Sequence, residues 1–156
     1  MVIQRWQSLI LMLVTALMAC FTFMSLGQVQ LTDYSLNFTT LGFTYEGEVT
    51  DAAPSGYYAH TWIFFIVSML SFILPFIAIF MFRNMKLQKT ICLLEVLLIL
   101  SLAAIGCAYG YYYFDDATVS WSSLIIAPLL AFIADILAYN RICADQKLLR
   151  AADRLR

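Results

Sequence analysis

The chain has 156 residues, of which 63% are hydrophobic and 12% are charged, and its net charge is −1. Soluble domains carry roughly 25% charged residues, so this composition excludes an ordinary soluble domain and indicates a protein built for lipid. The length allows one helical bundle without a second folded domain, and no nucleic-acid partner is expected.

The first predicted membrane span is residues 9–26, which contain no charged residue. About 18 residues is the minimum for a spanning helix. A basic start before an apolar run is also typical of a signal peptide, and Leu17–Cys20 resembles a lipoprotein cleavage box. The apolar run continues beyond it through Phe21, Phe23 and Met24, which favours a transmembrane helix.

Residues 27–60 form the only long polar segment, and we expect it on the outer side of the membrane. Apolar and polar residues alternate over Tyr34–Thr39 and again over Leu41–Glu46, which predicts two strands joined by a turn. A lone two-stranded hairpin is marginal in water. The apolar face of this hairpin is therefore expected to rest on the membrane surface or on a partner.

Three further apolar stretches predict three more membrane spans, two of which contain a proline, Pro75 and Pro128, that predicts a local kink. A short acidic turn, Asp115–Ser120, separates the last two spans. The charged tail, residues 140–156, has apolar residues at helical spacing and is expected to continue the last helix into the cytosol. The three spans are residues 61–82, 90–114 and 121–139.

The charges are divided between the two sides of this four-span arrangement. All nine basic residues fall on one side, and six acidic residues fall on the other. By the positive-inside rule, both termini are expected in the cytoplasm. The basic residues are Arg5, Arg83, Lys86, Lys89, Arg141, Lys147, Arg150, Arg154 and Arg156; the six acids are Asp33, Glu46, Glu48, Asp51, Asp115 and Asp116.

Two carboxyl groups remain inside the predicted spans, Glu95 in the third and Asp135 in the fourth. At 1.5 Å per residue both lie roughly 9 Å inside the inner boundary, at matched depth. An ionisable group in a membrane is costly and is a functional hypothesis by default. Two carboxyl groups in one apolar site can share a proton, which predicts a proton- or cation-responsive site. Alternatively, each acid is protonated, extends to the inner boundary, or pairs with Arg5, Arg83 or Arg141.

Small residues mark the predicted helix contacts. Gly106 shares a helical face with Glu95 and lies near Gly110, and Ala131 shares a face with Asp135. Because small residues let membrane helices approach closely, Gly106, Gly110 and Ala131 are predicted packing positions, and both acids are expected to point into the bundle. A Gly-x-x-x-Gly pair is also typical of a dimer face, but packing within the bundle is favoured.

The predicted cytoplasmic side carries a polar surface, and five of the nine basic residues lie in the tail. Attraction to anionic lipid contributes ~1 kcal/mol per cation near the surface, so lipid headgroups are expected partners. A docking surface for a membrane-protein partner is the alternative. The candidate residues are Gln4, Arg5, Arg83, Lys86, Lys89, Arg141, Arg150, Asp153 and Arg154.

No motif of a catalytic or metal site is present: the sequence has no serine-centred triad, HExxH, P-loop or GxGxxG pattern. His60 is the only histidine. A metal site joining it to Asp115 and Asp116 is disfavoured, because such sites usually bring several His or Cys ligands. We therefore predict no catalytic residue, no metal, no cofactor and no enzymatic activity.

Three stretches on the predicted cytoplasmic side resemble a known family: Met1–Ser8, Phe82–Gln88 and Asp145–Arg156. They resemble the domain-of-unknown-function family 4293, four-span inner-membrane proteins of Bacteroidetes. The resemblance implies the same architecture and a bacterial inner membrane, and it transfers no catalytic residue. It also implies that a neutral amide is more common near the position of Asp135, which weighs against a family-wide mechanism based on paired acids.

The expected fold is an all-α membrane protein, a four-transmembrane-helix bundle with both termini inside and a small outer β-hairpin between the first two helices. The expected function is non-enzymatic: an accessory or structural subunit of an inner-membrane complex, or a homo-oligomer, that binds its partner through its cytoplasmic surface or its hairpin. The alternative is a small proton-coupled transporter or ion-responsive membrane protein that uses Glu95 and Asp135.

Overall fold

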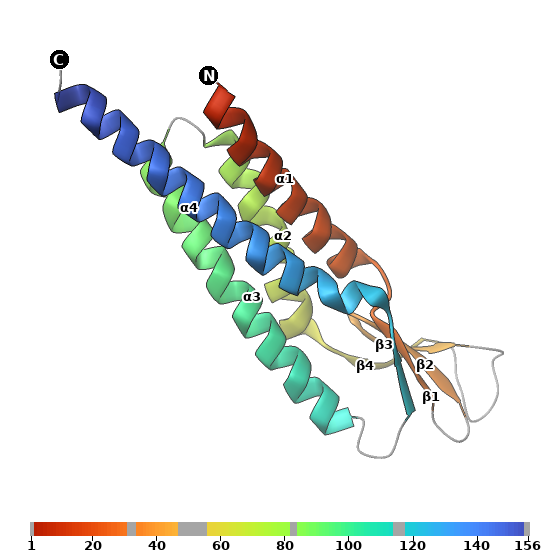
Figure 1. Ribbon diagram of the computed structural model, residues 1–156. Coiled ribbons are helices and arrows are strands. Elements are labelled where there is room, and N and C mark those ends of the chain that lie inside the picture. The colour runs from red at the N-terminus through yellow and green to blue at the C-terminus, as the bar shows by residue number, and fades with distance from the viewer. Residues whose placement is uncertain (1, 31–33, 47–55, 82–83, 114–117, 155–156) are drawn as a thin grey trace.

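The computed structural model describes residues 2–30, 34–46, 56–81, 84–113 and 118–154, and it describes only the backbone of residues 2–5, 110–113 and 149–154. The described chain forms a bundle of four long helices with an antiparallel β-sheet at one end (Figure 1). Both chain termini lie at the opposite end, which we call the terminal end (Figure 1). The helices are α1 (Val2–Phe23), α2 (Trp62–Phe80), α3 (Met85–Tyr113) and α4 (Ala127–Arg154).

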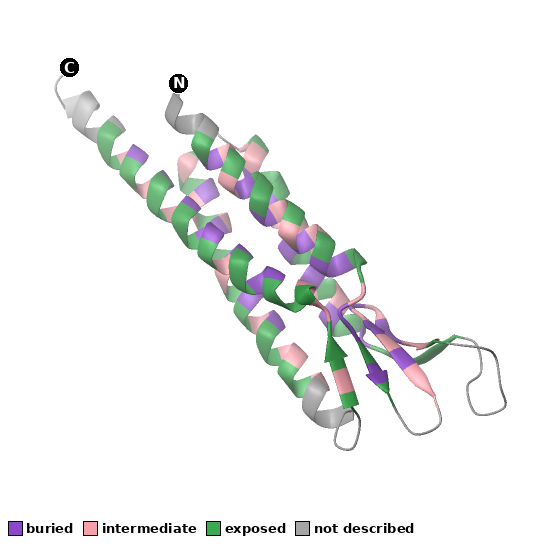
Figure 2. Cartoon of the chain, turned by 45° about the vertical axis from the view of Figure 1, so that its right-hand side comes forward, coloured by how far each residue is buried: buried purple, intermediate pink, exposed green. Residues whose placement is uncertain are grey.

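Each helix packs against two others: α1 and α3 both contact α2 and α4. Exposed leucine, isoleucine and phenylalanine side chains cover the outside of the bundle. Buried positions recur along each helix between exposed ones, so one stripe of each helix faces its neighbours (Figure 2). In the described residues, four helices are long and apolar enough to cross a membrane.

The side chains that form the buried stripes differ in size from helix to helix. On α2 and α4 they contain many small residues at a spacing of three and four, which lets the backbones approach closely. On α1 the stripe consists mainly of large apolar residues that fill the space between these two helices. The small buried residues are Ser68, Ser71 and Ala78 on α2 and Ala127, Ala131, Ala134 and Ala138 on α4; the large ones on α1 are Leu11, Val14, Met18 and Phe21.

The sheet has five antiparallel strands in the order β4-β3-β2-β1-β5. Its apolar face joins the core of the bundle, because the buried strand residues pack together with Met18, Phe21 and Phe64 of the helices. These strand residues are Val29, Leu36, Phe38 and Phe43. The strands are β1 (Gly27–Gln30), β2 (Ser35–Thr39), β3 (Gly42–Glu46), β4 (Tyr57–His60) and β5 (Thr118–Trp121).

The prediction of an all-α fold with one small hairpin was therefore wrong. The predicted hairpin corresponds to β2 and β3, but β1, β4 and β5 extend it on both sides. Thr118–Trp121 is a strand, and a 3-10 helix, Ser123–Ile126, leads from it into α4. Strands of four residues are too short to show a clear alternation. The partner of β5 also comes from a distant part of the chain, since the paired Thr118 and Gln30 are 88 residues apart.

Three threonines join the sheet to the bundle. The Thr61 hydroxyl, just before α2, donates to the Thr40 carbonyl at 2.8 Å, and the Thr40 hydroxyl donates to the Thr22 carbonyl at 2.6 Å. The Thr22 hydroxyl donates to the Met18 carbonyl at 2.7 Å and lies 2.5 Å from the Ser68 hydroxyl. All three threonines are buried. This chain of hydrogen bonds fixes the turn between β2 and β3 against α1 and α2.

Candidate functional site

The buried acids Glu95 and Asp135 form the most unusual side-chain arrangement in the bundle. Both have 0% exposed surface, and they interact electrostatically across the contact between α3 and α4. Glu95 lies on the buried stripe of α3, between Cys92 and Ile99, at helical spacing. The two acids predicted to point into the bundle thus both lie in its interior, on the neighbouring helices α3 and α4.

The surroundings of the pair offer few polar partners. None of the four carboxyl oxygens makes a hydrogen bond to a described group. The Ser71 hydroxyl of α2 lies beside Glu95, but no hydrogen bond of ordinary geometry joins them. The Cys92 thiol interacts with Asp135. One hydroxyl, one thiol and two carboxyl groups from three helices are thus buried in this part of the bundle.

The nearest described cations are engaged elsewhere. The Lys89 ammonium lies over the Tyr139 ring, 5.2 Å from the ring centroid, which is a cation–π distance. Arg141 is exposed, and its charge acts on Asp145. Two of the predicted arginine partners, Arg5 and Arg83, have no described side chain. Within the described structure, neither buried acid has a cation beside it.

A second polar layer, which sequence reasoning missed, lies nearer the terminal end. The Gln7 side-chain amide of α1 donates to the Asp145 carboxylate of α4, and both side chains are buried. The Gln88 amide of α3 donates to the Ala78 carbonyl of α2 at 3.3 Å. Each amide thus connects one pair of neighbouring helices. Gln7, Gln88 and Asp145 lie near the ends of apolar stretches, where polar residues are expected in any case, so no pattern in the sequence indicates that they are buried.

The predicted packing positions have different roles. Ala131 is fully buried in the stripe of α4. Gly106 lies on α3 opposite Phe64 of α2, where an added Cβ would be 3.6 Å from the ring, an ordinary contact. The closest approach of the helices therefore does not require a glycine at position 106. Gly110 lies in the part of α3 for which only the backbone is described.

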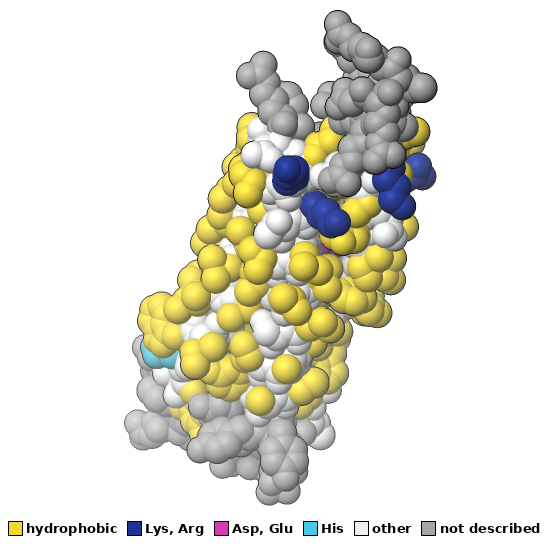
Figure 3. Space-filling view, turned by 90° about the vertical axis from the view of Figure 1, so that its left-hand side faces the viewer, with side chains coloured by type: hydrophobic (Ala, Val, Ile, Leu, Met, Phe, Trp, Pro, Cys, Tyr) yellow, Lys and Arg dark blue, Asp and Glu magenta, His cyan; other side chains and the backbone are white. Residues whose placement is uncertain are grey.

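The predicted cytoplasmic surface is described only in part. Figure 3 shows lysine and arginine side chains near the terminal end, while hydrophobic side chains cover most of this face of the bundle. Lys86 and Arg141 are exposed and Lys89 is half-buried. Arg83 lies outside the described residues. The side chains of Gln4, Arg5, Arg150, Asp153 and Arg154, all on helices, are outside the described part as well.

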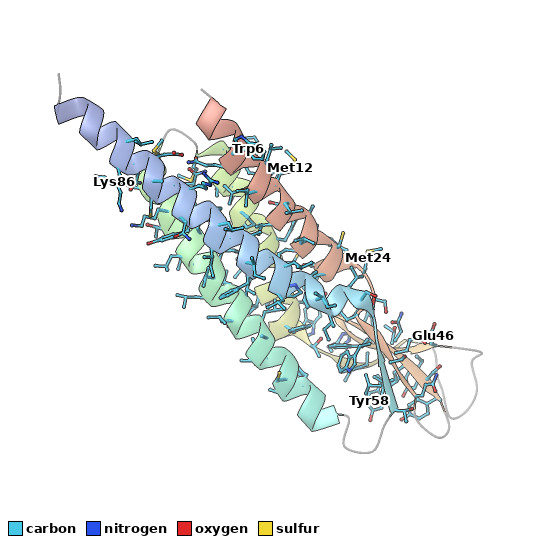
Figure 4. The ribbon with its side chains drawn as sticks, in the orientation of Figure 1. Trp6, Met12, Met24, Glu46, Tyr58 and Lys86 are labelled. Atoms are coloured by element: carbon cyan, nitrogen blue, oxygen red, sulfur yellow. The ribbon has the colours of Figure 1, made fainter. Side chains whose placement is uncertain are left out.

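The sheet presents a second, aromatic surface at the opposite end from Lys86 and Trp6, as the labelled Tyr58 and Glu46 indicate (Figure 4). On β4 and the start of α2, the His60 ring lies between two exposed rings, 4.5 Å from Tyr57 and 5.6 Å from Trp62 by ring centroids. We call Tyr57, His60 and Trp62 the β4 aromatic stack. β4 is an edge strand in the described sheet, because β3 is its only described neighbour.

Four apolar helices of spanning length, with hydrophobic residues outside and polar residues inside, are compatible with a multi-pass membrane protein. The particular family is shown by comparison with known families. The chain belongs to the family described as Domain of unknown function (DUF4293), whose model matches residues 3–155. No curated protein matches the chain.

Proposed function

We propose that this protein is a non-enzymatic accessory or structural subunit of a complex in a bacterial inner membrane, in a member of the Bacteroidetes. The four apolar helices support the membrane location. The grouping of basic residues on one side supports a cytoplasmic position for both termini. In this orientation the sheet lies outside the cytoplasm, and the basic tail binds anionic lipid headgroups.

The β4 aromatic stack is the observation that carries the proposal of a partner. Tyr57 and Trp62 of the stack each expose about half of their surface, and so does Tyr58 next to them on β4. An open edge strand offers unpaired backbone groups to another chain, and exposed tyrosine and tryptophan side chains are common anchors of protein interfaces. The partner of this edge is then a membrane protein with an exposed outer segment, or a second copy of this chain.

An experiment has to distinguish partner binding from a second role of the same aromatic residues. Tyrosine and tryptophan also gather at membrane–water interfaces, where their rings lie among lipid headgroups. Trp6 provides a control, because it is also an exposed aromatic residue but lies at the terminal end. Its substitution disturbs an interfacial anchor without touching the sheet.

The experiment is affinity purification of the full-length protein in a mild detergent, followed by quantitative mass spectrometry. We expect a partner, or a second copy, at a fixed ratio to the tagged chain. The double substitution Tyr57→Ser and His60→Ser reduces this ratio at least tenfold, whereas Trp6→Ser leaves it unchanged. A lone monomer, or equal loss with both variants, contradicts the proposal.

The alternative function is a small proton-coupled transporter, and the buried Glu95–Asp135 pair is the observation that favours it. A cavity of about 440 Å³ lies elsewhere, between α3 and α4 near the sheet. Apolar side chains line it, and neither acid contributes to its wall. A transporter predicts water access to Glu95 and loss of transport in Glu95→Gln with the fold kept, whereas the accessory subunit keeps its partner in this variant.

A further inference from the structure

α3 and α4 diverge toward the sheet, as both ribbon views show (Figures 1 and 2). The cavity of about 440 Å³ lies between them in this region, and we call it the α3–α4 cavity. α3 lines it with three small residues, Ala103, Gly106 and Cys107. Small residues let membrane helices touch where the helices approach each other. Here the helices diverge, so the small side chains leave a space that the two helices do not fill.

The α3–α4 cavity has a buried floor and an exposed mouth. Its floor includes Phe38 of β2, Phe64 of α2 and Leu102 of α3, each of which exposes at most 4% of its surface. Leu100 of α3 and Leu129 of α4 also line it, and each exposes more than half of its surface. The cavity therefore extends from the core to the apolar outer surface of the bundle. In the proposed membrane location this surface faces lipid, so a ligand enters from the hydrocarbon of the bilayer.

The lining of the α3–α4 cavity selects an uncharged hydrocarbon. Among the described residues that line it, none carries a charge. A polar ligand would give up its hydration here without gaining ionic partners, which costs free energy. The volume lies within the range of about 300–1,000 Å³ that is usual for ligand pockets. If the cavity stayed empty, the surrounding side chains would lose packing contacts, so an apolar occupant stabilises the bundle.

The position and depth of the α3–α4 cavity match one leaflet of a bilayer. Trp121 of β5 lines its sheet end and exposes about half of its surface, and its ring centroid lies 6.4 Å from that of Phe38 in an edge-on arrangement. Tryptophan gathers at the membrane–water interface. From Cys107 to Ile99, which both line the cavity, α3 extends about 12 Å away from the sheet. One leaflet contributes about 15 Å of hydrocarbon, so an extended chain that begins at the interface reaches the far end of the cavity.

We propose that the α3–α4 cavity binds one acyl chain of a phospholipid from the leaflet on the side of the sheet. The chain enters between Leu100 and Leu129 and packs against Phe64 and Leu102, while the headgroup stays outside, beside Trp121. The bound chain fills the space between α3 and α4 and supports their divergence. This proposal rests on the membrane location of the proposed function, and it is independent of the partner at the β4 aromatic stack.

Photo-labelling with a lipid probe tests whether the cavity is occupied. The full-length protein is reconstituted into liposomes of phosphatidylethanolamine and phosphatidylglycerol, which include phosphatidylethanolamine with a diazirine in one acyl chain. After irradiation, mass spectrometry maps the labelled residues. We expect adducts on Phe64 and Leu102, which are buried from lipid outside the cavity. Leu97, an exposed residue of α3 that does not line the cavity, reports general lipid contact and serves as the reference.

A pair of neighbouring alanines on α3 separates the cavity from the rest of the surface. Ala103→Trp places an indole in the cavity, whereas Ala104→Trp adds the same group at the next residue, which is exposed and does not line it. We expect the labelling of Phe64 and Leu102, relative to Leu97, to fall at least tenfold in Ala103→Trp. The same ratio should stay unchanged in Ala104→Trp.

A second pair on α4 keeps the test decisive if an α3 variant does not fold. Leu129 lines the cavity and its exposed neighbour Leu130 does not. We expect the tenfold loss of labelling in Leu129→Trp and not in Leu130→Trp. The partner ratio in affinity purification stays unchanged in all four variants, so a failure of lipid binding can be distinguished from a failure of the proposed function.

Three outcomes overturn the proposal. The first is a wild type without label on Phe64 and Leu102, because an empty cavity or one that holds a second copy of the chain excludes the lipid probe. The second is equal loss of labelling in both members of a variant pair. The third is loss of the label after a small share of a long-chain ubiquinone is added, which assigns the cavity to an isoprenoid chain instead.

Discussion

Replacing Gly42 with alanine is expected to distort the edge of the sheet that carries the β4 aromatic stack. Gly42 has a φ of 149°, which residues with a side chain rarely adopt. An added Cβ would lie 2.2 Å from the Ala59 carbonyl oxygen of β4, far inside van der Waals contact. Because Gly42 pairs with His60 in this strand, β4 has to move away from β3.

The free energy that Gly42→Ala costs has two parts. An unfavourable positive φ costs about 1–3 kcal/mol, and forcing extra atoms into a packed site costs about 1–3 kcal/mol more. Gly56 provides the control, because its φ of 125° is also positive but an added Cβ would meet nothing within 4 Å. Gly56→Ala is therefore expected to lose only the stability that the positive φ costs. The difference between the two variants therefore measures the clash with β4.

Hydrogen–deuterium exchange of the purified full-length variants gives the local free energy of strand opening. We expect the β3–β4 amides to exchange faster in Gly42→Ala than in Gly56→Ala, by about 5- to 150-fold, because the clash costs about 1–3 kcal/mol. The helix amides should remain unchanged in both variants. Equal exchange rates at β3 and β4 in the two variants would refute the close contact between these strands.

Two further predictions test the bundle and its orientation. Gly106→Ala is expected to raise thermal stability in detergent by up to ~1 kcal/mol, because alanine favours a helix and its Cβ fits against Phe64 at 3.6 Å; a marked loss of stability contradicts the packing. In a cysteine-free background, Glu46→Cys should react with a membrane-impermeant maleimide in spheroplasts and Lys147→Cys only after lysis, and the reverse pattern contradicts cytoplasmic termini.

The helices could be predicted because each is a long apolar stretch bounded by charge. α2, α3 and the buried stripe of α4 lie where hydropathy indicates them, and helical periodicity turned Glu95 and Asp135 toward the interior. The rise per residue of a helix also predicted that the two acids lie at matched depth. These features are local, so the residues along one segment contain enough information to indicate them.

The sheet and the second polar layer could not be predicted in the same way. Thr118–Trp121 forms a strand because its backbone pairs with β1, and no sequence pattern within these residues indicates that pairing. Ser71 and Gln88 look like ordinary polar residues in or beside an apolar stretch. Only the packing of separate helices shows that Ser71 meets Glu95 and that Gln88 reaches the Ala78 carbonyl.

Photo-crosslinking at the β4 aromatic stack tests the proposed partner binding most directly. A photoreactive benzoyl-phenylalanine replaces Tyr57 in one variant and Phe80, an exposed aromatic residue of α2 remote from the sheet, in a second. After irradiation in native membranes, we expect position 57 to form one discrete protein adduct, either with a single partner or with a second copy of the chain. Position 80 should crosslink to lipid alone. Lipid adducts alone at both positions would contradict partner binding through the sheet and would identify the stack as an interfacial aromatic belt.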